Sequence, residues 1–96
     1  MEYPEGTVLL IRLFRFKYGI TLAELSKETN LSAQLISQVE LMQRTATMQL
    51  QKRLADALIE VLRQRRALTE AALADYSIMN GKLFEPVRPV IGGVHI

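Results

Sequence analysis

The chain has 96 residues, of which 49% are hydrophobic and 23% are charged, and its formal net charge is +2 at pH 7. These values predict one small globular domain and exclude a disordered chain. They disfavour strong nonspecific binding to nucleic acid, which depends on many basic side chains that neutralise phosphates. The chain contains no cysteine, which rules out disulfides and thiolate metal sites and suits a cytoplasmic protein.

No membrane contact is expected from the N-terminal part of the chain. The longest apolar run, Val8–Ile11, is far too short to cross a bilayer. Acidic residues precede it where a secretion signal would have basic ones. We therefore expect neither a membrane partner nor export.

The first helix is expected over residues 7–18 and is unusually apolar. Its inward-facing stripe consists of Ile11, Phe14 and Tyr18. Four further apolar residues point to other faces: Leu9, Leu10, Leu13 and Phe16. A helix that is apolar nearly all round is normally buried on a second side. We therefore expect the C-terminal half of the chain or a second subunit to cover it.

Residues 21–40 predict two short helices joined by a tight turn, the first over residues 22–29. Asn30 stands at the turn, because Asn tolerates the left-handed conformation better than most residues. Ser32 is placed to cap a second helix over residues 32–41. The buried face of that helix carries Leu35, Ile36 and Val39.

The opposite face of the second helix carries uncharged side chains: Ala33, Gln34, Ser37 and Gln38. A helix with one face in the core and a row of amides and hydroxyls on the other is suited to lie in the major groove of DNA. Glutamine can form two hydrogen bonds to the edge of adenine, and serine can read either kind of edge. These four residues are the candidates for reading bases.

The spacing of this segment resembles the Cro/C1-type helix-turn-helix family of phage repressors and bacterial regulators, also called XRE-like. The family pattern T-x-x-E-L-x-x-x-x-x-V-S-x-x-x-I-S-x-x-E is in register with Thr21, Glu24, Leu25, Leu31, Ser32, Ile36, Ser37 and Glu40. Residues 11–15 and 19–21 resemble the family's first helix and the turn after it, and residues 54–58 resemble its fourth helix. The match covers residues 8–58 without a gap.

The resemblance implies an all-α, lambda-repressor-like helix-turn-helix domain that binds double-stranded DNA as a transcriptional regulator. Phosphate contacts are expected from five polar residues: Thr21, Ser32, Arg44, Thr45 and Thr47. In several phage repressors of this family an Arg in the first helix pairs with a Glu at the end of the recognition helix. Arg15 and Glu40 occupy the matching positions, and the alternative is that they are solvated independently.

The sequence departs from the family at several positions. Leu22 replaces a Gln that helps to hold a phosphate, Asn30 replaces the Gly of the turn, and Met42 replaces the Gly that usually follows the recognition helix. No Lys or Arg lies between Lys27 and Arg44, so the recognition helix carries no positive charge of its own. This neutrality is the feature that fits DNA binding least well.

Residues 47–79 keep a helical stripe of apolar residues with Thr47 as the expected N-cap, and no Gly or Pro interrupts them. One helix of these 33 residues would be roughly 50 Å long, more than a small globule can cover. We therefore favour a break near residues 65–69, where Thr69 can cap a new helix, over extension into a partner subunit.

The densest basic cluster consists of Arg63, Arg65 and Arg66. These side chains would either clamp the DNA backbone beside the recognition helix or form a solvated face of the long helix. Charged faces of helices are usually solvated, and we favour that interpretation.

The tail, residues 80–96, differs in character from the rest of the chain. Asn80 and Gly81 are expected to stop the helix, and prolines, a Gly-Gly pair and β-branched residues follow. We expect an extended arm that lies over the first helix, reaches a partner or places Arg88 in a minor groove, or else a frayed terminus. No strand partner for it is evident within the chain. His95 has no nearby acid or thiol, which argues against a ligand role.

No catalytic residue, metal site, cofactor or small-molecule ligand is expected, because the acids are dispersed and no phosphate loop or metal-ligand spacing is present. We divide the chain into a DNA-binding domain, residues 7–62, and a C-terminal helical extension with an extended arm, residues 63–96, that makes a homodimer. The leading interpretation is a cytoplasmic, nucleoid-associated repressor that binds an inverted repeat. The alternative is a protein-interaction module, an antitoxin or antirepressor, that holds another protein through the first helix or the tail.

Overall fold

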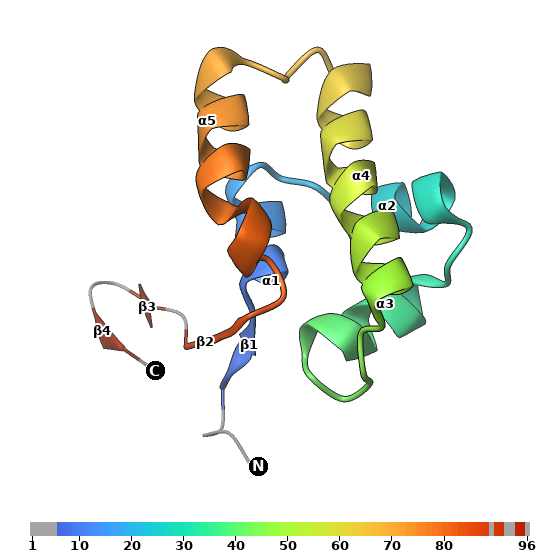
Figure 1. Ribbon diagram of the computed structural model, residues 1–96, viewed down its shortest axis with the longest axis vertical. Coiled ribbons are helices and arrows are strands. Elements are labelled where there is room, and N and C mark those ends of the chain that lie inside the picture. Colours follow the sequence, from blue (N-terminus) through green and yellow to red (C-terminus); the bar gives the residue numbers. More distant parts are fainter. Residues whose placement is uncertain (1–5, 89, 92–93, 96) are drawn as a thin grey trace.

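The computed structural model describes residues 6–88, 90–91 and 94–95, and within them the chain is mostly helical (Figure 1). The prediction of a mainly α-helical protein is therefore confirmed, apart from short strands. In chain order the elements are β1 (Val8–Leu9), α1 (Leu10–Lys17), α2 (Leu22–Thr29), α3 (Ala33–Glu40), α4 (Met48–Gln64), α5 (Glu70–Met79), a 3₁₀ turn (Asn80–Lys82), β2 (Pro86–Val87), β3 (Val90–Ile91) and β4 (Val94–His95). None of the helices in this part of the chain has the length and apolarity needed to cross a membrane.

The helices α2 and α3 are joined by the tight turn that the sequence predicts. Thr21 caps α2: its hydroxyl accepts from the Glu24 N–H at 3.1 Å, and the Glu24 carboxylate accepts from the Thr21 N–H at 2.9 Å. Asn30 ends the helix in the left-handed conformation, with a φ of 61°. Ser32 caps α3 by accepting from the Leu35 N–H at 3.0 Å. Local sequence signals therefore set the helix ends on both sides of the turn.

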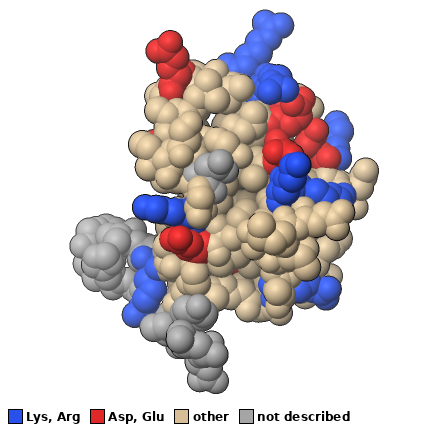
Figure 2. Space-filling view, in the orientation of Figure 1, with Lys and Arg blue, Asp and Glu red and all other residues tan. Residues whose placement is uncertain are grey.

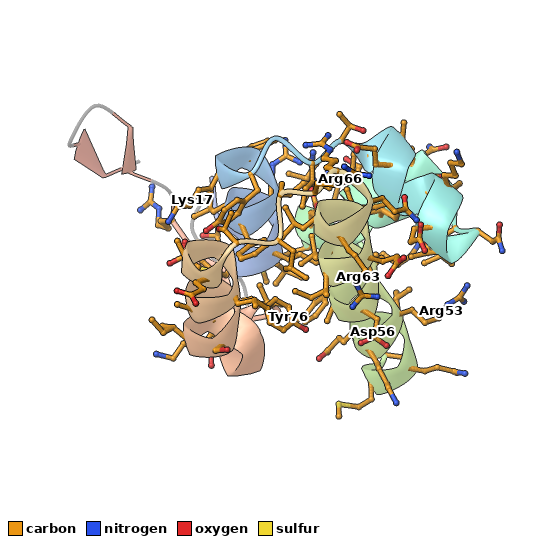
Figure 3. All side chains as sticks on the ribbon, turned by 90° about the horizontal axis from the view of Figure 1, so that it is seen from above. Lys17, Arg53, Asp56, Arg63, Arg66 and Tyr76 are labelled. Atoms are coloured by element: carbon orange, nitrogen blue, oxygen red, sulfur yellow. The ribbon has the colours of Figure 1, made fainter. Side chains whose placement is uncertain are left out.

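Two further helices, α4 and α5, stand side by side (Figures 1 and 3). Thr47 caps α4 as predicted, its hydroxyl accepting from the Leu50 N–H at 3.2 Å. α4 ends at Gln64, and Thr69 accepts from the Ala72 N–H at 3.1 Å in the first turn of α5. The predicted break is confirmed, and the second half of the segment folds back onto its own chain.

One hydrophobic core joins all of these helices with the C-terminal segment. Its buried members are Leu9, Ile11, Phe14, Ile20, Leu25, Ile36, Val39, Leu54, Ala57, Leu58, Val61, Leu62, Ala72 and Leu83. Ala72 and Leu83 come after the predicted boundary at residue 62, and they are 1% and 0% exposed in the same core. Residues after the boundary therefore contribute to the same core as residues 7–62.

The beginning of the chain differs from the predicted helix over residues 7–18. Val8–Leu9 form strand β1, and α1 begins only at Leu10. β1 pairs antiparallel with β2, and Val8 lies opposite Val87. The tail therefore has a strand partner within the chain that was not evident from the sequence. The pairing joins two residues from each end of the chain, too few to produce an alternating pattern.

The C-terminal segment contacts the beginning of the first helix. The Ile11 N–H donates to the Leu83 carbonyl at 2.7 Å, and the Leu10 N–H donates to the Glu85 carbonyl at 3.0 Å. These bonds satisfy amides in the first turn of α1 that have no partner within the helix. The Leu83 side chain is fully buried, while Phe16 remains 55% exposed. The segment thus covers only the beginning of the helix, while Leu10 and Leu13 stay half-buried.

The rest of the tail is extended where the structure describes it. β3 and β4 form an antiparallel pair that lies to one side of the helices (Figure 1). Arg88, between β2 and β3, is exposed. The predicted helix stop at Asn80 holds for α5, although the chain continues as a 3₁₀ turn to Lys82. Residues 89, 92–93 and 96 lie outside the described residues, as does the side chain of His95.

Polar contacts fasten α5 to α1. Asp75 accepts hydrogen bonds from the Lys17 ammonium, at 2.6 Å, and from the Tyr18 hydroxyl. These two donors hold the pKa of Asp75 below its ordinary value of 3.8. The Tyr76 ring projects from α5 toward α4 (Figure 3) and meets Phe14 edge-on, with 6.2 Å between the ring centroids.

We expect the attachment of α5 to weaken at acid pH. A carboxylate with a depressed pKa stabilises the fold above its unfolded pKa, near 3.8 for Asp75, and this stabilisation is lost as the pH falls through the lower folded value. Asp75→Asn should therefore lower the melting temperature at neutral pH but not well below pH 3.8. Melting curves of both chains across this range test the expectation, and an equal difference at every pH would contradict it.

Candidate nucleic-acid interface

The outer face of α3 carries the four predicted base-reading residues. Gln34 is exposed, while Ala33, Ser37 and Gln38 are half-buried. They face outward because the opposite side of the helix is anchored in the core. Gln34 and Gln38 are one turn apart and are therefore neighbours on the helix surface. The side chains of Gln34, Ser37 and Gln38 make no hydrogen bond to any residue that the structure describes, so they are available to a partner.

A shallow hollow lies beside this face. Its lining consists of Ser32, Gln34, Leu35, Gln38 and Arg44. The structure therefore brings four of the predicted DNA-binding residues together, from the cap of α3 to the segment that follows this helix. Arg44 is exposed and forms no ion pair within the described part of the chain. Its charge is available to a phosphate.

A second hollow shares Arg44 and places Thr45 next to it. Leu9 of β1 and Phe84 of the C-terminal segment also line this hollow. Both ends of the chain therefore lie against the segment that carries the predicted phosphate contacts. Met42, in the same segment, has a φ of 63°, in the left-handed region that normally favours glycine. The backbone turns here as it would with the glycine that the resembled family has at this position.

A buried ion pair fixes α3 against α1. Arg15 donates to both carboxylate oxygens of Glu40 at 2.8 Å and to the Ile20 carbonyl at 3.1 Å. Arg12 adds a third hydrogen bond to Glu40 at 3.1 Å. The Phe16 ring packs against both guanidinium groups, each 4.8 Å from the ring centroid. Glu40 is completely buried and Arg15 is 5% exposed, so the predicted pair is confirmed and independent solvation is excluded.

Thr21, Ser32 and Thr47 were predicted to bind phosphates through their hydroxyl groups. They differ in whether the hydroxyl proton is still free for a hydrogen bond to a phosphate. Thr21 Oγ1 lies 3.0 Å from the Glu24 carboxylate and donates to it, so its proton is already engaged and a negative charge lies beside it. Ser32 and Thr47 accept hydrogen bonds from backbone amides, which leaves their own protons for another acceptor. Ser32 and Thr47 are therefore suited to a phosphate, and Thr21 is poorly suited.

The basic cluster of Arg63, Arg65 and Arg66 lies at the C-terminal end of α4, where Figure 3 labels Arg63 and Arg66. α3 lies near the N-terminal end of α4 (Figure 1), and its Val39 lines a hollow together with Gln51 of α4. The 17 residues of α4 separate these two ends by roughly 25 Å. Arg63 is exposed and pairs with Glu60 at 2.8 Å. This cluster is therefore not placed to contact the same stretch of DNA backbone as α3. Arg63 and Arg66 fit the interpretation that we favoured, a solvated face of the helix.

Arg65 has a different role from its neighbours. It donates to the carbonyls of Tyr18 and Gly19, at 3.2 and 2.8 Å, and it pairs with the Glu24 carboxylate. Burial alone would raise the pKa of Glu24, but hydrogen bonds from the Thr21 N–H, from Arg65 and from the Thr21 hydroxyl outweigh it and lower the pKa. Arg65 therefore ties the end of α4 to the turn between α1 and α2.

The surface over α3 is largely uncharged, with basic side chains along its edge (Figure 2). Lys52 and Arg53 in α4 are exposed, like Arg44, and Arg53 donates to the Thr29 carbonyl at the end of α2. Among the described residues, no group of acids and histidines could hold a metal ion. The site offers hydrogen-bonding groups with a modest positive border, which permits recognition of a polar partner.

Two contributors to this region, Arg12 and Phe84, escaped the sequence-based prediction, as did the role of Arg65 at the turn between α1 and α2. A signal existed for Arg12, because it lies three residues before Arg15 and therefore on the same face of the helix. No local signal existed for Arg65 or Phe84, because their partners lie far away in the sequence.

The chain matches no protein-family model, no curated protein and no solved structure.

Proposed function

We propose that this chain is a sequence-specific DNA-binding transcriptional regulator, a repressor with a helix-turn-helix formed by α2 and α3. The observation that carries the proposal is the outer face of α3, where Gln34, Ser37 and Gln38 have available hydrogen-bonding groups. Beside them lies Arg44, which has no ion-pair partner among the described residues. An α-helix fits the major groove, where amides and hydroxyls can read base edges while a basic side chain meets the backbone. Such a regulator would act on the nucleoid in the cytoplasm.

The way in which α3 is held supports this proposal. Base reading requires that the side chains be presented at a fixed angle, because hydrogen bonds weaken steeply when they are misaligned. Two features fix α3: the Ser32 cap at its beginning and the buried pair of Glu40 with Arg15 at its end. The segment that follows turns back at Met42 and brings Arg44 beside Gln38.

One helix of this kind makes few contacts, so we propose that two copies bind an inverted repeat together. The outer face of α5 is suited to join them. Leu73 and Ile78 are 43% and 72% exposed on this helix, and Ala71 and Ala74 are also exposed. Figure 2 shows the surface over α5 as largely free of charged side chains. Small and apolar residues on a largely uncharged face permit close packing against a second copy.

Gln34→Ala or Gln38→Ala is expected to weaken binding to a specific site by about 1–3 kcal/mol, because each removes a pair of hydrogen bonds to a base. Arg44→Ala should weaken binding to all sequences and lower the salt dependence by about one unit. Fluorescence anisotropy with a duplex selected from a random library measures both effects. Gln64→Ala, at the opposite end of α4, is the matched control. Wild-type affinity in both α3 variants would show that this face does not read DNA.

The dimer is tested by sedimentation of the full chain at micromolar concentration. We expect the wild-type chain to sediment as a dimer and Ile78→Glu as a monomer, because a buried unpaired carboxylate would oppose the contact between two copies of α5. The control is Met48→Glu, which changes a residue that is 82% exposed on α4. A wild-type chain that is monomeric and still binds an inverted repeat tightly would contradict the proposed dimer.

The second candidate is a protein-interaction module, an antitoxin or antirepressor. It is favoured by the uncharged face of α3 and by Phe16, an aromatic ring that is 55% exposed next to Arg12 and Arg15. The apolar surplus of the first helix also supports it, because Leu10 and Leu13 stay half-buried beside the exposed Phe16. A folded chain that enriches no sequence from a random duplex library would favour this candidate over a DNA-binding regulator.

A further inference from the structure

We infer that the hollow between β1, the segment after α3 and the C-terminal segment binds a small carboxylate with an acyl chain, and that this ligand competes with DNA for Arg44. The competition rests on the proposed function and deepens it by naming a class of effector. Binding of the carboxylate itself does not depend on DNA. The hollow has a volume of about 310 Å³, at the lower end of the range for ligand pockets in proteins.

The apolar part of the lining comes from distant parts of the chain: Leu9, Val39, Met42 and Phe84. Figure 1 shows β1, the segment after α3 and β2 at the same end of the molecule. Leu9 and Val39 belong to the core, whereas Met42 and Phe84 are half-buried. An acyl chain in the hollow would remove apolar surface of Met42 and Phe84 from water, and the flexible thioether can adapt to it.

The apolar lining continues on the other side of Phe84. A neighbouring hollow of about 190 Å³ shares Phe84 and Gln51 with the first one and adds the apolar side chains of Met48 and Ala55. Met48 is exposed, so a longer ligand finds further apolar surface to cover. Two adjoining hollows of this kind favour an extended chain over a compact ring.

Polar groups that can hold a carboxylate line the first hollow as well. Gln43, Arg44 and Thr45 are exposed, and their side chains make no hydrogen bond to any residue that the structure describes. Arg44 is the only charged residue among the described ones that line this hollow. A guanidinium can donate two parallel hydrogen bonds to one carboxylate. The lining therefore matches a single negative charge attached to an apolar chain.

Arg44 connects this hollow with the proposed DNA-reading face. The same residue lines the hollow that contains Gln34 and Gln38. A carboxylate paired with Arg44 neutralises the charge that would otherwise meet a phosphate, so the ligand and DNA weaken each other. Linkage requires that the two effects be equal in size. The sequence predicts no small-molecule ligand, because packing of both chain ends forms this lining.

Binding of the ligand is tested without DNA, on the isotope-labelled full chain with octanoate as the probe. We expect saturable amide shifts centred on residues 42–46 and 84. The neutral analogue 1-octanol should bind about fivefold more weakly, because it lacks the charge that pairs with Arg44. Acetate should bind more than tenfold more weakly, because it lacks the chain. The absence of saturable shifts at these residues, or equal affinities for octanoate and 1-octanol, would overturn the carboxylate site.

Two variants test the lining. Phe84→Ala should weaken octanoate binding about fivefold, because the chain loses apolar contact, while affinity for a selected duplex stays unchanged. Phe16→Ala, at an exposed ring outside the hollow, is the matched control and should bind octanoate like the wild-type chain. Gln43→Glu changes an exposed residue and keeps the test decisive if Phe84→Ala does not fold. It should weaken binding of octanoate but not of 1-octanol, because its carboxylate repels the ligand's.

Fluorescence anisotropy with a selected duplex tests the competition. Saturating octanoate should weaken DNA binding by the wild-type chain several-fold and lower its salt dependence by about one unit. The DNA affinity of Arg44→Ala should not respond to octanoate. Octanoate that binds without changing the DNA affinity would overturn the competition and leave the proposed function intact. Failure to enrich any duplex would overturn the competition together with that function, while the titration without DNA still decides the carboxylate site.

Discussion

Glu40→Leu is expected to lower the free energy of unfolding by about 3–5 kcal/mol. Glu40 is completely buried and accepts hydrogen bonds from Arg15 and Arg12. Its loss leaves the Arg15 guanidinium, which is 5% exposed, with the Ile20 carbonyl as its remaining acceptor among the described residues. An unpaired charge that stays out of water is the cause of the large effect. Urea denaturation followed by circular dichroism measures it.

The double change Arg15→Met with Glu40→Leu should destabilise the chain less than either single change, because two apolar side chains then fill the space without an unpaired charge. Arg15→Met alone leaves Glu40 with Arg12 at 3.1 Å, so its cost should be the smaller of the two single changes. Arg12→Met, at a side chain that is 25% exposed, is the control for losing one charge-assisted hydrogen bond. If the losses of unfolding free energy in the two single variants simply add up in the double variant, Arg15 and Glu40 are not energetically coupled.

Leu83→Ala is expected to lower the free energy of unfolding by about 2–5 kcal/mol, because it opens a cavity in the core. Leu83 is fully buried, although it lies in an irregular segment near the end of the chain. The matched control is Ile78→Ala, at an apolar residue that is 72% exposed, where a change within about 0.5 kcal/mol is expected. Equal effects of the two substitutions would mean that the C-terminal segment does not belong to the core.

The helices around the central turn could be predicted from the sequence because their signals are local. The capping pair of Thr21 and Glu24, the left-handed Asn30 and the capping Ser32 each act within a few residues of their own position. The same holds for Thr47 and for the break between α4 and α5. Where a backbone conformation is determined by its neighbours in the sequence, the pattern of residue types is sufficient.

The two ends of the chain could not be predicted in this way. Val8–Leu9 were expected to be helical because an apolar run before a helix has no local signal that distinguishes it from the helix itself. Their strand partner lies more than 70 residues further along the chain. The burial of Leu83 and the role of Arg65 depend on equally distant segments. Such contacts arise from the packing of the whole domain.

The candidate site was predictable in part. The outward placement of Gln34 and Gln38 follows from helical periodicity, and their joining with Arg44 in one hollow agrees with the sequence-based expectation. The difference between Thr21 and Ser32 also has a local signal. Glu24 follows Thr21 by three residues and accepts the proton of its hydroxyl, whereas Leu35 stands at the same spacing after Ser32.

The most direct test of the central claim is a titration of the isotope-labelled full chain with a duplex that it has selected, followed by amide chemical shifts. If α3 reads DNA, the largest changes should occur in residues 32–38 and 44–47, while the cluster around Arg63 and the face around Phe16 should change little. Changes centred on Phe16 with α3 unaffected, or a chain that responds to no selected duplex, would contradict DNA reading by this helix.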